Sequence, residues 1–323
     1  MALISRLAVW ALLLTTCFLS AQARAEAVTF ITDFGFNGRH SYFFVAQQKG
    51  FYREEGLEVS ILRGQGSADA IRKVAAGTAT FGFADAGSLV LARANDGIPV
   101  RLFSIVYASP PQAIFSLAER GITSPHALEG RTIADTASSA MRLMFPAYAR
   151  AAGIDASKVT WVTADGAALA SMLAAGRVDA IGQFTVGEPL LAAVTAPRPL
   201  ARLAYGDAGL RYYGNGLVAT EQTIATRPDL VRAFARATLR GLRYSMENPA
   251  EAGAIMNAQN RQVTAEVAAA ETRLVGELAE VPGRPLGAID PAAIQATIEV
   301  VTGAFSLRQP VRAEELFAPG LAE

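Results

Sequence analysis

Four side chains suited to recognising a small ligand follow a short apolar stretch at residues 28–32: Asp33, Phe34, Asn37 and His40. A phenyl face stacks on a flat heteroaromatic ring, while carboxylate, amide and imidazole groups hydrogen-bond the edge of such a ring. His40 is also a candidate general base, provided that a partner group lies within hydrogen-bond reach. The structural alternatives are that Asn37 only caps a helix and that His40 only packs. The pattern favours a ligand edge, with catalysis as the competing interpretation.

The elements around this group place it at the end of a strand. Residues 28–32 are apolar and predict a strand, and the helix after His40 is expected to stop at Gly50. A second helical turn stops at Gly56, where glycine again takes the left-handed conformation without steric cost. In open α/β sheets, ligands bind at the carboxyl ends of the strands. Residues 33–40 would lie at such an end.

The rest of the chain alternates strands with helices up to about residue 220. Further strands are predicted at 57–62, 80–84, 100–106, 112–117, 132–134, 159–162, 178–181, 200–204 and 217–220. Such alternation indicates right-handed crossovers and mostly parallel sheets. The helix–Gly–strand segment 73–82 is echoed by 172–181, which favours two similar α/β lobes over one large sheet.

We therefore expect an α/β fold of two lobes with a ligand cleft between them. Lobe 1 is assigned to residues 26–109 and 214–323, and lobe 2 to residues 110–213. The chain would cross between the lobes twice and form a hinge there. From Pro228 onward the apolar spacing is helical, so lobe 1 ends in a helical segment.

Three predicted helix starts supply further candidate ligand contacts. A helix start attracts an anionic group through its free backbone N–H groups and the helix dipole. The equally weighted alternative is an ordinary tight turn, with Ser67 as the N-cap of its helix. The candidates at these starts are Gly66, Ser67, Asp85, Ser88, Ser138 and Ser139.

The remaining candidates lie in the second set of strands and at the return to lobe 1. Gln183 and Phe184 follow a strand of lobe 2, at the position equivalent to Asp33 in lobe 1. Glu188 precedes a proline, so its alternative role is to begin a helix. Tyr213 and Asn215 lie where the chain crosses back, at the expected hinge and cleft floor.

Composition and the N-terminal segment restrict the class of protein to which the chain can belong. Basic and acidic residues are equal at 29 each and hydrophobic residues make up 51%, which describes a globular chain with no basic face for nucleic acid. Arg6, the apolar run 7–19 and the small residues that follow predict a secretory signal cleaved after Ala25, with Ala23 as the alternative site. The only cysteine, Cys17, falls inside this signal. We predict no cysteine chemistry and no metal site in the mature protein.

Signatures of common enzymes are missing from the chain. It has no G-x-S-x-G, no H-E-x-x-H and no Walker A loop. His126, the second histidine, is expected at the surface. We therefore predict a binding protein without a cofactor.

The segment Asn37-x-x-His40 followed by Tyr42-x-x-Val-Ala-Gln-x-Lys-Gly-Phe-Tyr-x-Glu-Glu-Gly-Leu-Glu-Val59 resembles the NMT1/THI5-like solute-binding proteins of ABC transporters. Gly77-x-x-x-Phe-Gly-Phe-Ala-Asp85 and Leu173-x-x-Gly-x-Val-Asp-Ala180 are similar to the same group, which includes binders of thiamine-pyrimidine precursors, riboflavin and alkanesulfonates. The resemblance implies a periplasmic-binding-protein type II fold, in which the two lobes close on the ligand.

The resemblance also implies partners and a site. The protein is expected to be a periplasmic monomer that docks on a permease in the inner membrane. In the pyrimidine binders the Asn-x-x-His turn lies by the ligand, which carries over onto Asn37 and His40. Phe34 stands where those binders usually have tryptophan, so the ligand is left as pyrimidine-like, flavin-like or sulfonate-like. The alternatives are a pyrimidine-synthase-like enzyme using His40, although the cysteine motif of the yeast-type synthases is missing, or a sensor module.

Overall fold

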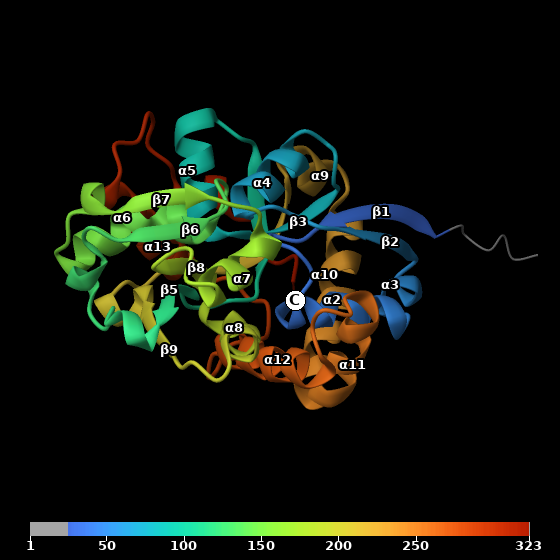
Figure 1. Cartoon of the computed structure of the whole chain (residues 1–323). Helices are drawn as coiled ribbons and strands as arrows, with labels where there is room; N and C mark the ends of the chain where they lie inside the picture. Colours follow the sequence, from blue (N-terminus) through green and yellow to red (C-terminus); the bar gives the residue numbers. More distant parts are fainter. Residues whose placement is uncertain (1–24, 323) are drawn as a thin grey trace, which may run out of the picture.

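A computed structural model describes residues 25–322 (Figure 1). The predicted signal sequence, its cleavage after Ala23 or Ala25, and Cys17 concern the segment 1–24 and so fall outside or at the very edge of the described residues. None of the described helices combines the length and the apolar character needed to cross a membrane.

The chain builds two five-stranded sheets, and we name them sheet A and sheet B. Sheet A has the strand order β2-β1-β3-β10-β4, and sheet B has the order β7-β6-β8-β5-β9. Sheet A consists of β1 (Glu26–Ile31), β2 (Leu57–Leu62), β3 (Phe81–Asp85), β4 (Val100–Ile105) and β10 (Asn215–Thr220). Sheet B consists of β5 (Gln112–Leu117), β6 (Thr132–Asp135), β7 (Thr160–Thr163), β8 (Ala180–Phe184) and β9 (Leu200–Ala204).

Both sheets are mixed, and each contains one strand that runs against the others. In sheet A, β1 pairs in parallel with β2 and β3, whereas β10 is antiparallel to β3 and β4. In sheet B, β6 pairs in parallel with β7 and β8, whereas β5 is antiparallel to β8 and β9. In each sheet the antiparallel strand is the first one that the chain forms after it crosses over from the other sheet. Two separate sheets joined by two chain crossings agree with the α/β architecture that the sequence predicted.

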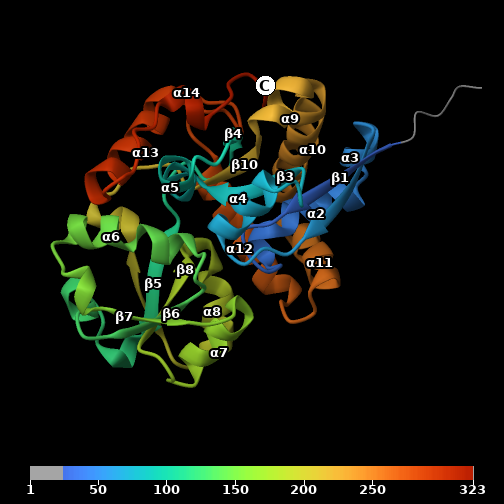
Figure 2. The same ribbon diagram turned by 90° about the horizontal axis from the view of Figure 1, so that it is seen from above.

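Helices cover both sheets, and Figure 2 shows the two groups of elements side by side. The helices near sheet A are α2 (Ser41–Gln48), α3 (Phe51–Glu54), α4 (Ser67–Ala75), α5 (Ala86–Asp96), α9 (Glu221–Thr226), α10 (Pro228–Glu247), α11 (Pro249–Gln259) and α12 (Ala265–Ala279). Those near sheet B are α6 (Ala140–Ala152), α7 (Leu169–Ala174) and α8 (Glu188–Thr195). The last helices are α13 (Pro291–Ala304), which packs on both α5 and α6, and α14 (Ala313–Leu316).

An aromatic cluster joins β1, β3, α2 and α10 beneath the predicted ligand edge. The ring of Phe30 lies 4.4 Å from that of Phe43 and 5.4 Å from that of Phe234, and Phe81 stacks on Phe234 at 4.3 Å. All four side chains are fully buried. Aromatic pairs of this kind add to the free energy of burial, so the end of β1 rests on a rigid base.

The two chain crossings between the sheets run next to each other. Residues 106–111 lead from β4 to β5, and residues 205–214 lead from β9 to β10. Tyr107 donates its N–H to the Asn215 carbonyl at 2.8 Å, and Gly214 donates to the Tyr107 carbonyl at 2.9 Å. The strands divide between the sheets at the positions expected for two lobes. The lobe boundaries and the hinge stay a prediction.

Candidate functional site

Asp33, at the end of β1, is the centre of a buried hydrogen-bond network. Its carboxylate accepts from Arg39 Nη1 at 2.9 and 3.0 Å, from His40 Nε2 at 2.8 Å and from Asn215 Nδ2 at 2.8 Å. Each of these side chains is at most 3% exposed. The structure therefore brings together three of the predicted residues, Asp33, His40 and Asn215, although Asn215 is 182 positions away from Asp33 in the chain.

The protonation states in this network follow from its charges. Burial alone would raise the pKa of Asp33, but Arg39 and His40 beside it hold that pKa below its usual value. Burial and the neighbouring guanidinium lower the pKa of His40 to about 4. A neutral His40 beside an ionised Asp33 must carry its proton on Nε2, since a carboxylate only accepts. Nδ1 then carries no proton, and the nearby Gly35 carbonyl can only accept. Nδ1 therefore has no hydrogen-bond partner.

These states bear on the catalytic interpretation of His40. Asp33 does supply the partner group that a general base would require. However, His40 is fully buried, and a pKa of about 4 lies well below the value that makes an efficient base near pH 7. The geometry suits a histidine that holds Asp33 and the turn in place.

Arg39 is the residue of this network that the sequence reasoning missed. Its guanidinium carbon lies over two aromatic rings, 4.7 Å from the centroid of Phe184 and 5.8 Å from that of Phe34. Phe184 ends β8 of sheet B, so this contact spans the two sheets. The sequence shows only that a cationic residue directly precedes His40. Such a residue can be exposed as readily as buried, so its position alone does not identify it.

A cavity of about 180 Å³ lies between the sheet A and sheet B elements next to this network. Predicted residues Phe34, Asn37 and Gln183 line it, and most of the other lining groups are apolar. Asn37 is 5% exposed, and its Oδ1 has no hydrogen-bond partner. The remaining lining residues are Gly35, Phe36, Arg63, Gly166, Ala167, Leu169, Ala170, Leu190, Leu191, Val194, Asn260, Gln262 and Val263.

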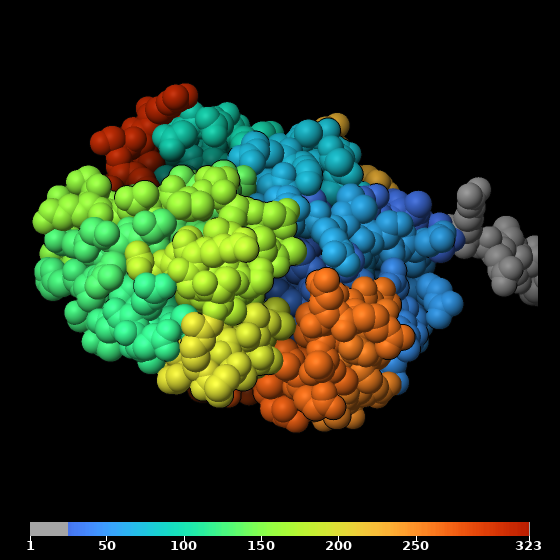
Figure 3. Space-filling model, viewed as in Figure 1, coloured from blue at the N-terminus to red at the C-terminus, as the bar shows by residue number. Residues whose placement is uncertain are grey.

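The two sides of the molecule touch around this cavity, as the adjoining surfaces in Figure 3 illustrate. A Cβ atom on Gly166 would lie 2.3 Å from the Phe34 ring, and one on Gly66 would lie 2.2 Å from the Ser138 carbonyl oxygen. Thr136 donates its hydroxyl to the Gln65 carbonyl at 3.0 Å. The described conformation is therefore a closed one.

The three predicted helix starts do converge, but protein groups satisfy them. The Ser138 carbonyl accepts from the N–H of Ala68 in the first turn of α4. Ser67 is not the N-cap of α4, because Gly66 takes that position and the Ser67 hydroxyl accepts from Asp85 N–H at 3.1 Å instead.

Two further cap residues serve their own helices. Asp85 caps α5 through the N–H and hydroxyl of Ser88, and Ser139 caps α6 through Met141 N–H. These groups hold the helix starts in place rather than leaving them free for an anion.

Asp85 also joins the two sheets. Gln112, the first residue of β5, donates Nε2 to the Asp85 carboxylate at 2.6 Å, and its own Oε1 has no partner. Gln112 was not among the predicted residues, because nothing in its local sequence indicates that the β4–β5 crossing would place it beside Asp85.

Two of the predicted residues belong neither to the cavity lining, nor to the Asp33 network, nor to the three helix starts. Glu188 begins α8 and forms an exposed ion pair with Arg202 at 2.7 Å, which agrees with its alternative role as a helix-start residue. Tyr213 accepts from Asp290 N–H at 2.9 Å and so holds the start of α13. His126 is exposed, as predicted.

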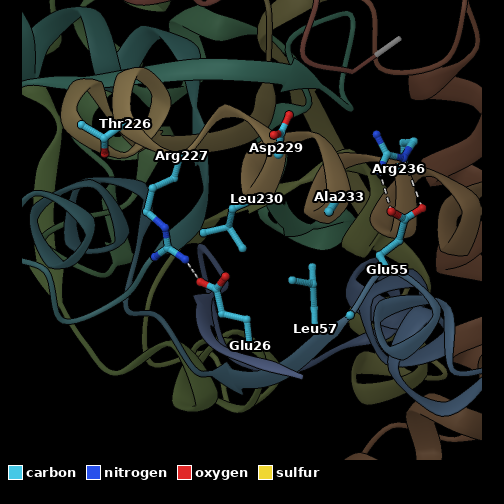
Figure 4. Close-up of a pocket in the computed structure, with 10 residues that line it drawn as sticks. Glu26, Glu55, Leu57, Thr226, Arg227, Asp229, Leu230, Ala233 and Arg236 are labelled. Carbon is cyan, nitrogen blue, oxygen red and sulfur yellow. Dashed lines mark hydrogen bonds and ion pairs between the residues drawn. The ribbon is translucent and has the colours of Figure 1, made fainter. Parts of the chain in front are cut away.

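A larger hollow of about 510 Å³ lies at the far end of sheet A, between β1, the α3–β2 turn and α10. Figure 4 shows the ion pairs at its rim, Glu26 with Arg227 and Glu55 with Arg236. Leu57 and Leu230 lie between these pairs. Its carboxylates and guanidinium groups are largely paired at the solvent-exposed surface, and none of the buried partnerless groups lies there. The smaller cavity beside Asp33 is therefore the better candidate site.

Comparison with known proteins identifies the family. The family model described as NMT1/THI5 like matches residues 37–252, which is more than half of the chain. The chain belongs to the NMT1/THI5-like family. The predicted resemblance is thereby confirmed.

Relatives of this NMT1/THI5-like chain include binding proteins and synthases. It is 26% identical to the formylaminopyrimidine-binding protein of Halalkalibacterium halodurans, over 91% of this chain and 90% of that protein. It is 29% identical to the riboflavin-binding protein RibY of Chloroflexus aurantiacus, over 72% and 66%. It is 27% identical to the 4-amino-5-hydroxymethyl-2-methylpyrimidine phosphate synthase of Legionella pneumophila, over 70% and 71%.

Solved structures support the fold of this NMT1/THI5-like protein. The alkanesulfonate-binding protein SsuA from Xanthomonas axonopodis pv. citri, bound to MOPS, superposes with a TM-score of 0.71. The match covers 90% of this chain and 98% of that one at 14% identity. At this identity the similarity concerns the fold.

Buried acids make the stability of the protein depend on pH. Burial raises the pKa of Asp135 to about 7, although Ser139 donates to its carboxylate. A raised pKa in the folded state means that stability is fully present at low pH and is lost as the pH rises through about 7. The difference in the free energy of unfolding between the wild type and Asp135→Asn should therefore change with pH. The wild type should lose about 1.4 kcal/mol per pH unit relative to the variant between pH 5 and 6.5.

Urea unfolding of both proteins across this pH range checks the prediction. The same substitution at the exposed Asp229 is the control. Because burial also raises the pKa values of Asp85 and Glu271 to about 7, Asp135→Asn should itself still lose stability as the pH rises, with a smaller slope than the wild type. A difference between wild type and Asp135→Asn that stays constant with pH would contradict the assignment.

Proposed function

We propose that this chain is a solute-binding protein that holds a small heteroaromatic molecule in the cavity between two lobes, residues 26–109 with 214–323 and residues 110–213. The observation that carries the proposal is the Asn37 amide, which is buried, lacks a partner at Oδ1 and lines a mostly apolar cavity beside Phe34. An unpaired buried amide costs free energy unless a ligand satisfies it. A ring edge with a donor would satisfy it while the ring packs near Phe34.

The size and charge of the cavity favour a single-ring ligand. Its volume of about 180 Å³ is below the ~300–1,000 Å³ of pockets that hold drug-sized molecules. A pyrimidine suits this space better than a flavin. Asp33 and Arg39 offset each other, so the buried network adds little net charge. Arg63 at the rim is the group that would favour a sulfonate-like ligand, which we place second.

The relatives support the same choice of ligand. The protein that is similar over nine tenths of both chains is named for binding a formylaminopyrimidine. We propose an aminopyrimidine as the ligand of this chain, with delivery to an ABC permease after export through the N-terminal signal. The protein would act in the periplasm as a monomer.

Calorimetric titration with a panel of ligands tests the proposal. The panel contains a formylaminopyrimidine, 4-amino-5-hydroxymethyl-2-methylpyrimidine, riboflavin, taurine and an aromatic acid. We expect the pyrimidines to bind most tightly, and Asn37→Ala to weaken that binding by about 5- to 100-fold, the equivalent of one lost hydrogen bond to a buried group. Gln262→Ala, at an exposed position of the same cavity, is the matched control and should change the affinity less than about twofold.

Two outcomes would contradict this function. Absence of binding to every compound of the panel would exclude the ligand classes proposed here. Turnover of a compound, with loss of turnover in His40→Ala, would favour the synthase-like alternative instead.

A further inference from the structure

Asn37 occupies the N-cap position of the turn that carries the candidate site but does not act as a cap. The 3₁₀ helix η2 (Gly38–His40) leads directly into α2, and Asn37 precedes it in an extended conformation with φ of −144°. Asparagine at this position usually accepts an N–H from the second or third residue of the helix. Here its side chain forms no such hydrogen bond.

A carboxylate from a distant part of the chain takes the hydrogen bond that Asn37 leaves free. Glu271 of α12 is fully buried, and its Oε2 accepts from the N–H of Arg39, the second residue of η2, at 3.2 Å. This is one of the N–H groups that an asparagine cap would bind. Capping by Asn37 and capping by Glu271 therefore compete for the same donor.

Close packing fixes Glu271 against the turn. A Cβ atom on Gly38 would lie 2.5 Å from Ala268 Cα and 2.7 Å from Glu271 Oε2, so only glycine allows α12 to approach this closely. Thr272 donates its hydroxyl to the Gly38 carbonyl at 3.3 Å. Three residues of α12 thus hold one turn of backbone.

The electrostatic surroundings also suit a cap at this place. The groups that face Glu271 are the N–H groups of Gly38 and Arg39, the Arg39 guanidinium, the Tyr107 hydroxyl and, from the sheet B side, the N–H of Leu190. An acceptor is favourable at the start of η2 and α2, where backbone N–H groups point outward.

We propose that Glu271 replaces Asn37 as the cap of this turn and thereby keeps the Asn37 amide free for the ligand. Glu271 is a positioning residue in this scheme, since it acts on the ligand through Asn37. The inference rests on the proposed function for its ligand, whereas the exchange of caps is a property of the ligand-free protein.

The ligand-free test follows the Arg39 amide and the Asn37 side chain by NMR. In Glu271→Ala, Asn37 should take over the Arg39 N–H, so its side-chain NH₂ signals should move while the Arg39 amide stays protected from hydrogen exchange. Asn37→Ala alone should also keep that amide protected, through Glu271. The double variant should exchange about fivefold faster than either single variant, since one cap contributes roughly 1 kcal/mol. Glu271→Gln keeps an acceptor and should leave the Asn37 signals in place.

The ligand test measures the affinity for the formylaminopyrimidine probe. Glu271→Ala, Asn37→Ala and the double variant should lose affinity by the same factor, because each removes the same free amide, and Glu271→Gln should restore most of it. If the double variant loses affinity by the product of the two single factors, the proposed coupling between Glu271 and Asn37 is wrong. Unmoved Asn37 signals in Glu271→Ala, together with an unprotected Arg39 amide, would overturn the exchange of caps. If the wild type binds no probe, the proposed function fails, while the ligand-free result still decides the capping.

Discussion

Replacing Asp33 with asparagine is expected to lower the free energy of unfolding by about 3–5 kcal/mol, the cost of leaving a buried partner charge uncompensated. Asp33 balances Arg39, which is 2% exposed and has no other carboxylate within ion-pair distance among residues 25–322. Asparagine would also offer its amide hydrogens to His40 and Asn215, which both donate toward this position. Chemical denaturation at pH 7 measures the loss.

A double-mutant cycle separates the charge effect from a change of shape. Arg39→Met removes the cation and keeps most of its length, so Asp33→Asn combined with Arg39→Met should be more stable than Asp33→Asn alone. Asp229→Asn, at an exposed position, is the control substitution. Destabilisation that simply adds up in the double variant would mean that the ion pair is not the reason for the loss.

Gly166→Ala is expected to weaken ligand binding by about 10- to 100-fold, because closure would force the new methyl group against Phe34. The added Cβ would lie 2.3 Å from the ring, and relieving such an overlap in a packed interface costs roughly 1–3 kcal/mol. Phe34 and Gly166 come from opposite sides of the cavity, so an open form would not feel the overlap. The substitution should therefore shift the population towards the open form.

The control for this experiment is Gly35→Ala. Gly35 lines the same cavity, but nothing lies within 4 Å of the place that its Cβ would take. It should change affinity for the pyrimidine probe by less than about threefold. Small-angle scattering of ligand-free protein supplies the second measurement, with a larger radius of gyration expected for Gly166→Ala only. An unchanged radius and unchanged affinity would contradict the closure mechanism.

Local patterns were enough to predict most of the strands and helices. The predicted ranges for β2, β5 and β9 are the observed ones, since each is an apolar pattern that directly follows a glycine or a proline. Gly50 and Gly56 do take left-handed conformations, with φ of 82° and 73°. The observed starts of β8 and β10 differ by two residues from the predicted ones. Val178 is buried but precedes β8, and the polar Asn215 belongs to β10 because it pairs with Asp85 of β3.

The sequence by itself determined the α/β fold, the family and the presence of polar and aromatic groups after β1, because strand periodicity, helix-ending glycines and family motifs are local features. Only the tertiary structure decided what those groups do. Arg39 and Glu271 are charged residues that a local pattern assigns to the surface, yet both are buried, because Asp33 and the start of η2 offer partners that lie up to 232 positions away. In the proposed scheme the free amide of Asn37 follows from that long-range contact, since the buried N–H of Arg39 needs an acceptor and the fold brings Glu271 to it.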